Sequence, residues 1–566
     1  MNGPTGTARP GAWRAGDGPG RAGPRPLGLA PGWGAVLALV AAITIARLIF
    51  VALGPLTLSA DEAHYWEWAR RVDWSYYTKG PGVAWAIAVS TALLGETELG
   101  VRLPALVCSA LGALAVSRWT LDMFGDGRAA VAACCAWLAA PALQVVGVLM
   151  TIDGPMVACW AMGAWAGWHA VTGGRRAWLG LGAAVGAGFV FKYTAALLAP
   201  GIVAAAWLVR ARRVRPGWAA LGAGAALLGV VPIAIWNAQH DWVTVRHLLG
   251  HLGLPGGDRP IVPGHNDGPG YSPLWTLELT GLVIATGGPS LVLGLLGLGP
   301  ALREGTRQRD AAVYCLAVSA PVLLLYLIVS FFTRVEANWP MAALVGFCPL
   351  AGLAAVRGLD LASHGLRAAW HAALIAMALG PAAMAGIWIA AATGARVPVI
   401  PVHRVTGLGT LAESTQQMRE RLRERTGLEP FVMAIHYGRA SQMAFALPDH
   451  PRTYGVSSHF GDGRRTQYDL WPMTDLSRPA ANEPLLGRPG ILFHGTVAEW
   501  RRFFERVVEI GPLQGEPKPD RGMFIGYGYT GMHDREPERG RSGRRSGDEA
   551  DGGDKTSSAH GVGGEP

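Results

Sequence analysis

Long blocks of apolar residues, separated by short polar segments, fill the first two thirds of the sequence. A helix needs roughly 20 apolar residues to cross the hydrocarbon core of a bilayer. Blocks of about that length predict membrane-spanning helices near residues 33–53, 101–119, 128–149, 154–172, 177–192, 194–210, 217–236, 274–300, 311–332, 338–356 and 368–393. A shorter block, 82–94, predicts a helix at the membrane surface. The pattern therefore predicts a polytopic helical membrane protein with about eleven crossings.

The pattern changes at both ends of this region. Residues 1–31 are rich in Gly, Pro and Arg, and residues 533–566 are charged and rich in Gly and Ser, so both are predicted to be disordered. The apolar run that starts at Trp33 is too long for a signal-peptide core and lacks a convincing cleavage site, which favours a retained first span. Alternating strand and helix patterns predict a small soluble α/β domain over 395–532. The membrane domain is thus predicted over 32–394, with its first outer loop at 54–100.

Charge adds a topology to this picture. Only 16% of the residues are charged, against about a quarter in soluble proteins. The basic residues behind the net charge of +9 concentrate in the tails and in short links between apolar blocks, which is typical of membrane topology and argues against a nucleic-acid partner. With the Arg-rich links in the cytoplasm, the first outer loop and the C-terminal domain lie on the extracytoplasmic side of the cell (inner) membrane. The first outer loop is itself basic, which needs a separate cause.

The stretch LSADEAHYWEW places two adjacent carboxylates, Asp61 and Glu62, just after the first apolar block. Ser59 and Glu62 have the spacing of a capping box at a helix start, so Glu62 fits either a cap or a site residue. A capping box does not require Asp61. A carboxylate that is partly desolvated at a membrane boundary can act as a general base, and Asp61 is the candidate for that role.

Further polar residues recur at the outer ends of predicted spans. Lys79, in YYTKGPGVAW, suits a lipid phosphate, although a single Lys there also fits ordinary snorkelling to the interface. Asp153 lies in TIDGP, Lys192 in FKYTAALL, and Glu336 and Asn338 in RVEANWP. Each residue alone is ordinary for an interface. Together they place acids and bases at one membrane face on separate elements, as a site between helices requires.

The motifs also resemble a known family. DEAHYWEW, YYTKGPGVAW, VRLP, TIDGP, GFVFKYTAALLAP, WNAQHDW and EANWP resemble, in this order, motifs of the bacterial family 39 glycosyltransferases, which are relatives of protein O-mannosyltransferases and lipid A aminoarabinose transferases. YGRASQMAFALPDHP and RRTQYDLW extend the resemblance into the C-terminal region. The resemblance implies the GT-C membrane fold. It also implies transfer of a sugar from a polyprenyl-phosphate donor to a lipid, glycan or protein acceptor outside the cytoplasm.

The resemblance implies roles for particular residues. Asp61 matches the candidate base for the acceptor hydroxyl, Lys79 matches a contact to the donor phosphate, and Asp153 matches a second carboxylate of the site. The turn KGPG departs from the KPP or HPP run that is more usual in the family, which leaves the pose of Lys79 undetermined. The other candidates for substrate binding are Glu62, Tyr65, Arg102, Lys192, Glu336 and Asn338. His247 and His251 lack an acidic third ligand at a matching spacing, so no metal site is predicted, while dependence on a divalent cation stays open.

The chemistry of such a transfer agrees with these residues. It needs a base for the incoming hydroxyl and cations for the departing phosphate. Asp61 and Lys79 supply one of each, which explains the basic first outer loop, and direct displacement with inversion at the anomeric carbon is expected. A membrane transporter is the main alternative, although the sequence shows no internal repeat of the kind that transporters carry. A cytoplasmic nucleotide-sugar transferase and a membrane scaffold are two further alternatives.

Overall fold

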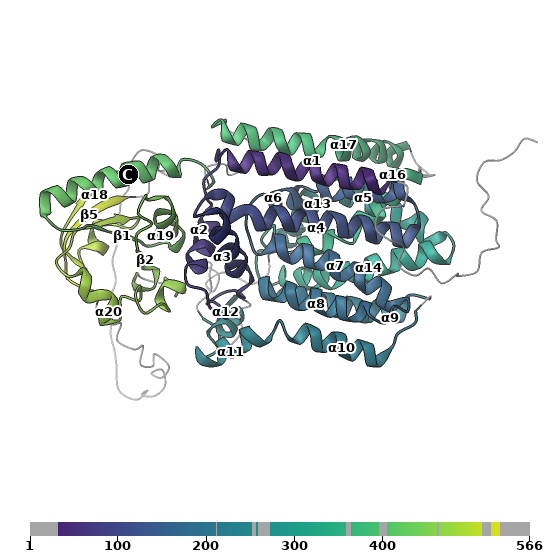
Figure 1. Cartoon of the computed structure of the whole chain (residues 1–566), viewed down its shortest axis with the longest axis horizontal. Coiled ribbons are helices and arrows are strands. Elements are labelled where there is room, and N and C mark those ends of the chain that lie inside the picture. The colour runs from purple at the N-terminus through teal and green to yellow at the C-terminus, as the bar shows by residue number, and fades with distance from the viewer. Residues whose placement is uncertain are drawn as a thin grey trace, which may run out of the picture.

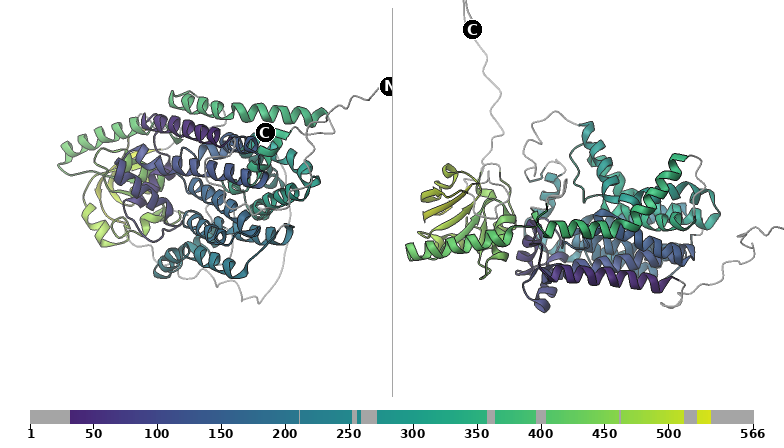
Figure 2. Two further views of the ribbon diagram at one scale, coloured as in Figure 1. Left: turned by 45° about the vertical axis from the view of Figure 1, so that its right-hand side comes forward. Right: turned by 90° about the horizontal axis from the view of Figure 1, so that it is seen from above.

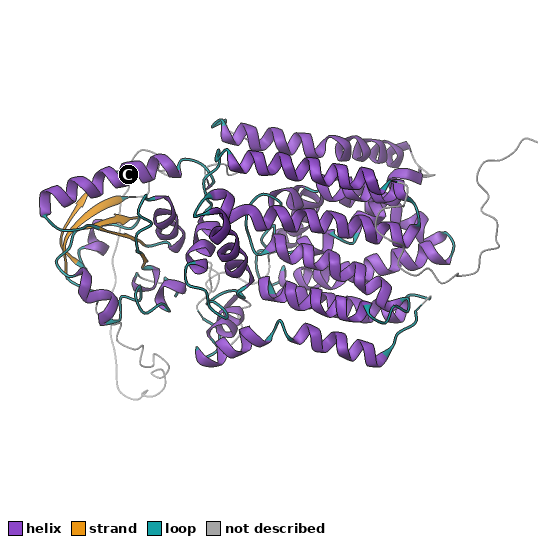
Figure 3. Ribbon diagram, in the orientation of Figure 1, coloured by secondary structure: helices purple, strands orange, loops and turns teal. Residues whose placement is uncertain are grey.

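The computed structural model describes residues 32–210, 212–251, 256–258, 272–357, 364–395, 404–460, 463–511 and 522–532. A helical bundle and a smaller domain built on a sheet lie end to end (Figure 1), and the strands are confined to the smaller domain (Figure 3). The helices α2 (Ala60–Ala69) and α3 (Gly82–Leu94) lie between the two parts. The predicted disordered tails, 1–31 and 533–566, lie outside the described residues.

The bundle contains a helix or a pair of helices for every predicted span. Its helices are α1 (Trp33–Ala52), α4 (Glu98–Phe124), α5 (Gly127–Ala139), α6 (Pro141–Val145), α7 (Asp153–Val171), α8 (Ala177–Phe191), α9 (Leu198–Leu208), α10 (Pro216–Leu227), α11 (Val231–Gln239), α13 (Pro273–Arg303), α14 (Thr306–Val329), α15 (Met341–Leu344), α16 (Phe347–Arg357) and α17 (His364–Ala392). The short helix η1 (Tyr193–Leu197) precedes α9, and α12 (Val243–His251) follows α11.

Not every helix in the bundle is long. Among the described residues, α1, α4, α13, α14 and α17 are long and apolar enough to cross a membrane alone, and α10 with α11 forms a sixth candidate that bends by 43°. The chain is therefore a multi-pass membrane protein. The other predicted spans correspond to shorter or less apolar helices, such as α5 and α8.

Packing in the bundle follows the rules for helices in lipid. The outer helices α1 and α17 expose large apolar side chains, such as Ile49 and Ile375, as lipid-facing helices do. Inside the bundle, small residues allow helices to approach closely. A Cβ atom at Gly182 of α8 would lie 1.9 Å from the carbonyl oxygen of Gly222 of α10, so neither position has room for a larger residue unless the helices separate.

The C-terminal domain is a five-stranded mixed sheet in the order β2-β1-β3-β5-β4. Strand β1 is parallel to β2 and β3, whereas β5 is antiparallel to β3 and β4. Strands β1, β3 and β5 lie in the segments FVMAIHY, ILFHG and MFIGYGY. The principal elements are α18 (Leu408–Thr426), β1 (Phe431–Ala434), α19 (Tyr437–Ala446), β2 (Thr453–Gly455), α20 (Pro479–Asn482), β3 (Gly490–Phe493), α21 (Val497–Trp500), β4 (Phe504–Glu509) and β5 (Met523–Tyr529).

The outer-loop helices and the C-terminal domain share one hydrophobic core. Trp66 and Trp68 of α2 and Ile87 of α3 are buried in the same cluster as Met443 and Phe445 of α19. The Trp66 and Phe445 rings lie edge to face with centroids 5.1 Å apart. Seen from above in Figure 2, α2 and α3 again lie between the sheet and the bundle. The domain therefore packs onto the first outer loop instead of standing free of the membrane domain.

Candidate functional site

The first turn of α2 carries both carboxylates of the DEAHYWEW motif. The predicted capping box is present: the Glu62 backbone N–H donates to Ser59 Oγ at 3.4 Å, and the Ser59 backbone N–H donates to Glu62 Oε2 at 3.0 Å. This box fixes where the helix begins. Asp61 takes no part in it, so its carboxylate is available for another role.

Glu62 forms a buried ion pair with Arg102 of α4. Arg102 Nε and Nη2 donate to the two carboxylate oxygens at 2.8 and 2.9 Å, and both side chains are almost completely buried. The Met150 backbone N–H also donates to Glu62 Oε1, at 2.9 Å, while Arg102 donates to the carbonyl oxygens of Leu56 and Thr57 at 2.8 Å. This geometry favours a structural role for Glu62 and Arg102 over the predicted contact to substrate.

Glu62 stays ionised although it is buried, because its partners stabilise the carboxylate. Burial alone would raise the pKa of the Glu62 carboxyl, but the Arg102 charge and the hydrogen bonds to the carboxylate outweigh it and hold the pKa below its usual value. The ion pair ties the start of α2 to α4 and to the segment before α7.

Three other predicted site residues meet at the end of the bundle. Lys192 Nζ lies 2.6 Å from Asp153 Oδ1, and Asn338 Nδ2 donates to Asp153 Oδ2 at 2.8 Å. Asp153 is buried in the first turn of α7, where the helix dipole favours a negative charge. Lys192 follows the end of α8, and Asn338 precedes α15. The structure thus brings together groups from three separate elements, as their positions at predicted span ends indicated.

The KGPG turn brings Lys79 to this end of the bundle. A Cβ atom at Gly80 would lie 2.3 Å from the carbonyl oxygen of Val190, and one at Gly82 would lie 2.9 Å from the ring of Phe191. The two glycines therefore allow the turn to pack against the last residues of α8. This close contact leaves no room for a side chain at either position and fixes the course of the turn that carries Lys79.

Lys79 lies in the electric field of both predicted catalytic carboxylates. Burial and the positive charge of Lys192 lower the pKa of the Lys79 ammonium to about 8, and the negative charges of Asp153 and Asp61 oppose that shift. These four charged groups therefore form one electrostatic cluster, in which Lys79 interacts with both carboxylates.

The C-terminal domain provides a hydrogen-bond donor to Asp61. Tyr437, the first residue of α19, donates from its hydroxyl to Asp61 Oδ1 at 3.1 Å. The Asp61 side chain is accessible to solvent, yet the surrounding protein limits its hydration and raises the pKa of the carboxyl. The Tyr437 hydrogen bond and the charges of Lys79, Arg404 and Arg464 act in the opposite direction. Tyr437 and Arg464 did not emerge as site residues from the sequence, although both lie in motifs that carry the family resemblance.

The two remaining predicted site residues differ in burial: Tyr65 is buried and Glu336 is exposed. Tyr65 is buried on α2. Burial, followed by interactions with Asp61, Tyr437 and Asp153, raises the pKa of its hydroxyl, so Tyr65 lies near both carboxylates as a neutral group. Glu336 is exposed, and within the described part of the chain its carboxylate makes no hydrogen bond or ion pair. Glu336 is therefore not held in the Asp153 cluster by any such contact.

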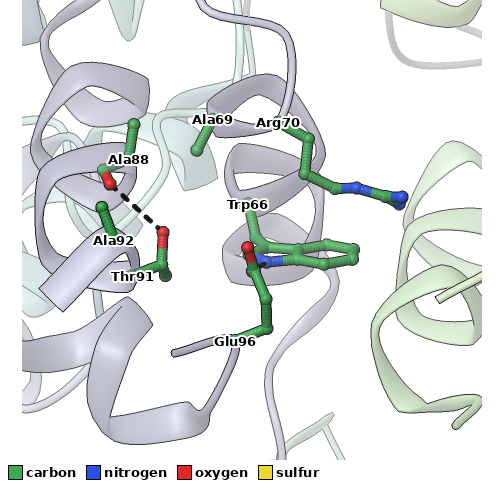
Figure 4. Close-up of a pocket in the computed structure, with 7 residues that line it drawn as sticks. All are labelled: Trp66, Ala69, Arg70, Ala88, Thr91, Ala92 and Glu96. Carbon is green, nitrogen blue, oxygen red and sulfur yellow. Dashed lines mark hydrogen bonds between the residues drawn. The ribbon is translucent and has the colours of Figure 1, made fainter. Parts of the chain in front are cut away.

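A separate pocket lies between α2 and α3 (Figure 4). The Trp66 indole N–H donates to the Glu96 carboxylate there, and the Arg70 guanidinium lies 4.7 Å from the centre of the Trp66 ring. Its lining residues are Trp66, Ala69, Arg70, Ala88, Thr91, Ala92 and Glu96. None of the predicted site residues lines this pocket, so the candidate site is the Asp61, Lys79 and Asp153 cluster.

Metal ligands do not converge in the part of the chain that the structure describes. No group of three or more His, Cys, Asp or Glu side chains there is arranged to hold a metal ion. The side chain of His251, one of the two histidines considered from the sequence, lies outside the described residues.

Known structures share this architecture. The apo crystal structure of ArnT from Cupriavidus metallidurans superposes with a TM-score of 0.59 and 17% identity, covering 87% of this chain and 98% of that chain. The same protein bound to undecaprenyl phosphate gives a TM-score of 0.57 and 16% identity, covering 86% and 97%. The chain therefore has an ArnT-like GT-C fold.

Sequence comparisons agree with the fold. Residues 78–236 match the family model described as dolichyl-phosphate-mannose-protein mannosyltransferase. The lipid A galacturonosyltransferase RgtD of Rhizobium johnstonii is 26% identical over 312 residues, 55% of this chain and 63% of that protein. The undecaprenyl phosphate-alpha-4-amino-4-deoxy-L-arabinose arabinosyl transferase of Erwinia tasmaniensis is 27% identical over 374 residues, 60% of this chain and 63% of that protein. The chain thus spans less than two thirds of these curated relatives. The predicted resemblance to the family 39 glycosyltransferases is confirmed.

The buried ion pair gives a stability prediction. Glu62→Gln should destabilise the protein by about 3–5 kcal/mol, because it leaves the Arg102 charge buried and uncompensated. The measurement is the thermal unfolding of the purified protein in detergent. Arg128→Gln is the control, because the Arg128–Asp126 pair is exposed and its loss should change little. Equal unfolding temperatures for the two variants would contradict the structural role of Glu62.

Proposed function

We propose that this protein is an integral membrane glycosyltransferase that moves a sugar from a polyprenyl-phosphate donor to a hydroxyl of an extracytoplasmic acceptor. The observation that carries the proposal is the convergence of Asp61, Lys79 and the Asp153–Lys192 pair from four separate segments. An accessible carboxylate beside fixed cations is what transfer from a lipid phosphate requires. The relatives named for undecaprenyl-phosphate sugars and for lipid A support this donor class and, among lipid, glycan and protein acceptors, favour a lipid.

In the proposed reaction, Asp61 takes the proton of the acceptor hydroxyl as its oxygen attacks the anomeric carbon. The bond between that carbon and the phosphate oxygen breaks, and its electron pair leaves with the polyprenyl phosphate. The new bond forms opposite the leaving group, so the configuration at the anomeric carbon inverts. The raised pKa of the Asp61 carboxyl makes its ionised form a better proton acceptor. Lys79 stabilises the charge of the departing phosphate.

The buried Asp153 would serve this reaction mainly by holding its neighbours. Each of its oxygens is already engaged, one by Lys192 and the other by Asn338. Asp153 therefore orients Lys192 beside Lys79 and balances part of the positive charge that the phosphate would meet. In this assignment Lys192 and Asn338 are donor-binding or positioning groups, and Tyr65 contributes a neutral hydroxyl near the two carboxylates.

The proposed topology has about eleven crossings, with the candidate site and the 395–532 domain on the extracytoplasmic side of the inner membrane. It is supported by the positions of the charged residues along α4. The start of α4 adjoins the outer loop, whereas its other end carries Arg118 and is contacted by Arg307, whose Nε donates to the Met123 carbonyl oxygen at 2.7 Å. Basic residues at that end agree with a cytoplasmic location. Membrane lipids would surround the exposed apolar faces of α1 and α17.

Replacement of the proposed base gives the direct test of function. In cells that lack the gene, complementation with Asp61→Asn should restore transfer at a rate lower by roughly 10²–10⁴-fold, because the amide cannot accept the proton. Mass spectrometry of envelope lipids and glycans should show one sugar modification missing and a polyprenyl-phosphate sugar accumulating. Glu98→Gln, which alters a carboxylate in the first turn of α4, is the matched control. A wild-type profile from the Asp61→Asn strain would rule out Asp61 as the base, and would leave Asp153 as the base, a transporter or a membrane scaffold as the alternatives.

The pKa of Lys79 predicts a pH dependence. The ammonium is charged below its pKa of about 8 and loses its charge as the pH rises through that value. Binding of polyprenyl phosphate to the purified protein should therefore weaken above about pH 8. Lys79→Arg should shift this weakening to higher pH, because a guanidinium stays charged. Equilibrium binding of the lipid phosphate at a series of pH values measures the effect even if the variant no longer catalyses transfer. The same alkaline weakening in the variant would exclude Lys79 as its cause.

A further inference from the structure

We propose that the C-terminal domain completes the catalytic site, and that Tyr437 is the positioning residue through which this domain acts on Asp61. The inference rests on the proposed function, because it assigns Asp61 the role of base. The inference gives the C-terminal domain a role in the transfer reaction itself, in addition to any role in binding other molecules.

The first support is the way that α19 is held against α2. A Cβ atom at Gly438 would lie 2.5 Å from the Cβ atom of Ala60, so the two helices approach as closely as a glycine allows. Gln442 Nε2 donates to the Leu58 carbonyl oxygen at 3.1 Å, and the Tyr77 backbone N–H donates to Gln467 Oε1 at 2.6 Å. These contacts join the domain to two separate parts of the first outer loop, the segment before α2 and the segment before α3. The Tyr437 hydroxyl is therefore delivered by a fixed interface.

The second support is the environment of the Tyr437 ring. The ring packs against two imidazoles, with centroids 4.5 Å from His64 and 4.4 Å from His436. Burial, followed by the charge of Asp61, raises the pKa of the Tyr437 hydroxyl above its usual value. The hydroxyl therefore stays protonated and is available as a hydrogen-bond donor. A protonated donor at a fixed position is what a carboxylate needs if it is to be held in one rotamer.

The third support is a chain of buried hydrogen bonds that locks His64 in place. His64 Nε2 accepts from the Trp68 indole N–H at 3.2 Å, so its Nδ1 carries the proton and faces Ser441 Oγ at 3.0 Å. Ser441 Oγ in turn lies 2.9 Å from the Tyr468 hydroxyl. Burial, with positive charge nearby, lowers the pKa of His64 to about 3, so the ring stays neutral. His64 therefore links α2 to the domain without adding a charge beside Asp61.

The result is a base with one oxygen held and the other available. Tyr437 engages Asp61 Oδ1, and within the described part of the chain Oδ2 accepts no hydrogen bond. The acceptor hydroxyl can therefore approach Oδ2 while the carboxylate stays in one orientation. The ionisable or charged groups that act on Asp61 are Tyr65 on its own helix, Tyr437, Lys79, Arg404 and Arg464. Of these, Tyr437 provides the hydrogen bond.

The test compares Tyr437→Phe with wild type in purified full-length protein, using a polyprenyl-phosphate sugar and extracted envelope lipid as acceptor. Loss of a hydrogen bond to a charged group should lower kcat by roughly 10- to 100-fold, with little change in the KM for the donor. Because the lost bond favoured the carboxylate, the pKa of Asp61 should rise, and the acidic limb of the pH–rate profile should move to higher pH. Tyr454→Phe, in the core on the other face of the sheet, is the control and should leave the limb in place.

A second pair of variants tests the docking without touching the hydroxyl. Gly438→Ala should push α19 away from α2 and reproduce both the lower kcat and the shifted limb. Adding Ala60→Gly removes the atom that the new methyl group would meet, so the double variant should recover much of the wild-type rate. If the domain has no role in the reaction, the double variant should show no recovery of the rate relative to Gly438→Ala.

The outcomes separate this inference from the proposed function. If the wild-type protein transfers no sugar, the proposed function fails. If Asp61→Asn abolishes transfer while Tyr437→Phe behaves like Tyr454→Phe, the enzyme assignment stands and the role of Tyr437 is wrong. A lower rate for Tyr437→Phe at every pH, with no movement of the acidic limb, would also overturn the positioning role, because a purely structural defect produces that result.

Discussion

The buried carboxylate of Glu62 is the point on which the arrangement of the site depends. It joins the cap of α2, the guanidinium of Arg102 in α4 and the backbone N–H of Met150 before α7. A buried ion pair contributes little net stability, because desolvation of the two charges offsets most of their attraction. However, once Glu62 and Arg102 are both buried, few other arrangements of the two side chains would keep the charges paired. The pair therefore specifies where α2 starts, and with it the direction of the neighbouring Asp61.

The two adjacent carboxylates of the LSADEAHYWEW motif, Asp61 and Glu62, thus lie in different environments. Glu62 points inward to a guanidinium and stays ionised, while Asp61, one residue earlier on the same turn, remains accessible and less readily ionised. Successive residues on a helix point about 100° apart, so a single turn can place one acid in the core and the other at the site. The difference between the two carboxyls comes entirely from what each one faces, because their position in the chain is nearly the same.

Some of this organisation is readable from the sequence. The apolar blocks coincide with helices because burial in lipid depends on composition over a long window. The capping box at Ser59 is local and was predicted from spacing alone. The meeting of Asp153, Lys192 and Asn338 followed from their positions at span ends, which places them at one membrane face. Their mutual contacts depended on helix packing, and Glu336, predicted by the same reasoning, is exposed.

Contacts between distant segments could not be predicted in this way. Asp61 and Tyr437 are separated by 376 positions, and no periodicity or spacing connects them. The Glu62–Arg102 pair spans 40 positions, and a capping role already accounted for Glu62. The predicted boundary near residue 395 follows a change in composition along the sequence. It does not separate two hydrophobic cores, because Trp66 and Trp68 from the first outer loop pack with Met443 and Phe445.

The shared core changes how the proposed base, Asp61, must be understood. In the proposed reaction an acceptor has to reach Asp61, so the carboxylate cannot be buried, and an exposed aspartate samples several rotamers unless something holds it. Catalysis gains most when reacting groups are already oriented, since orientation then costs nothing during the reaction. The first outer loop alone offers Asp61 a helix start and nearby cations. The domain that packs on it adds a neutral donor, packed against two imidazoles, that engages one oxygen and leaves the other open. Access and orientation, which conflict for a group on a single element, become compatible when a second domain provides the orientation.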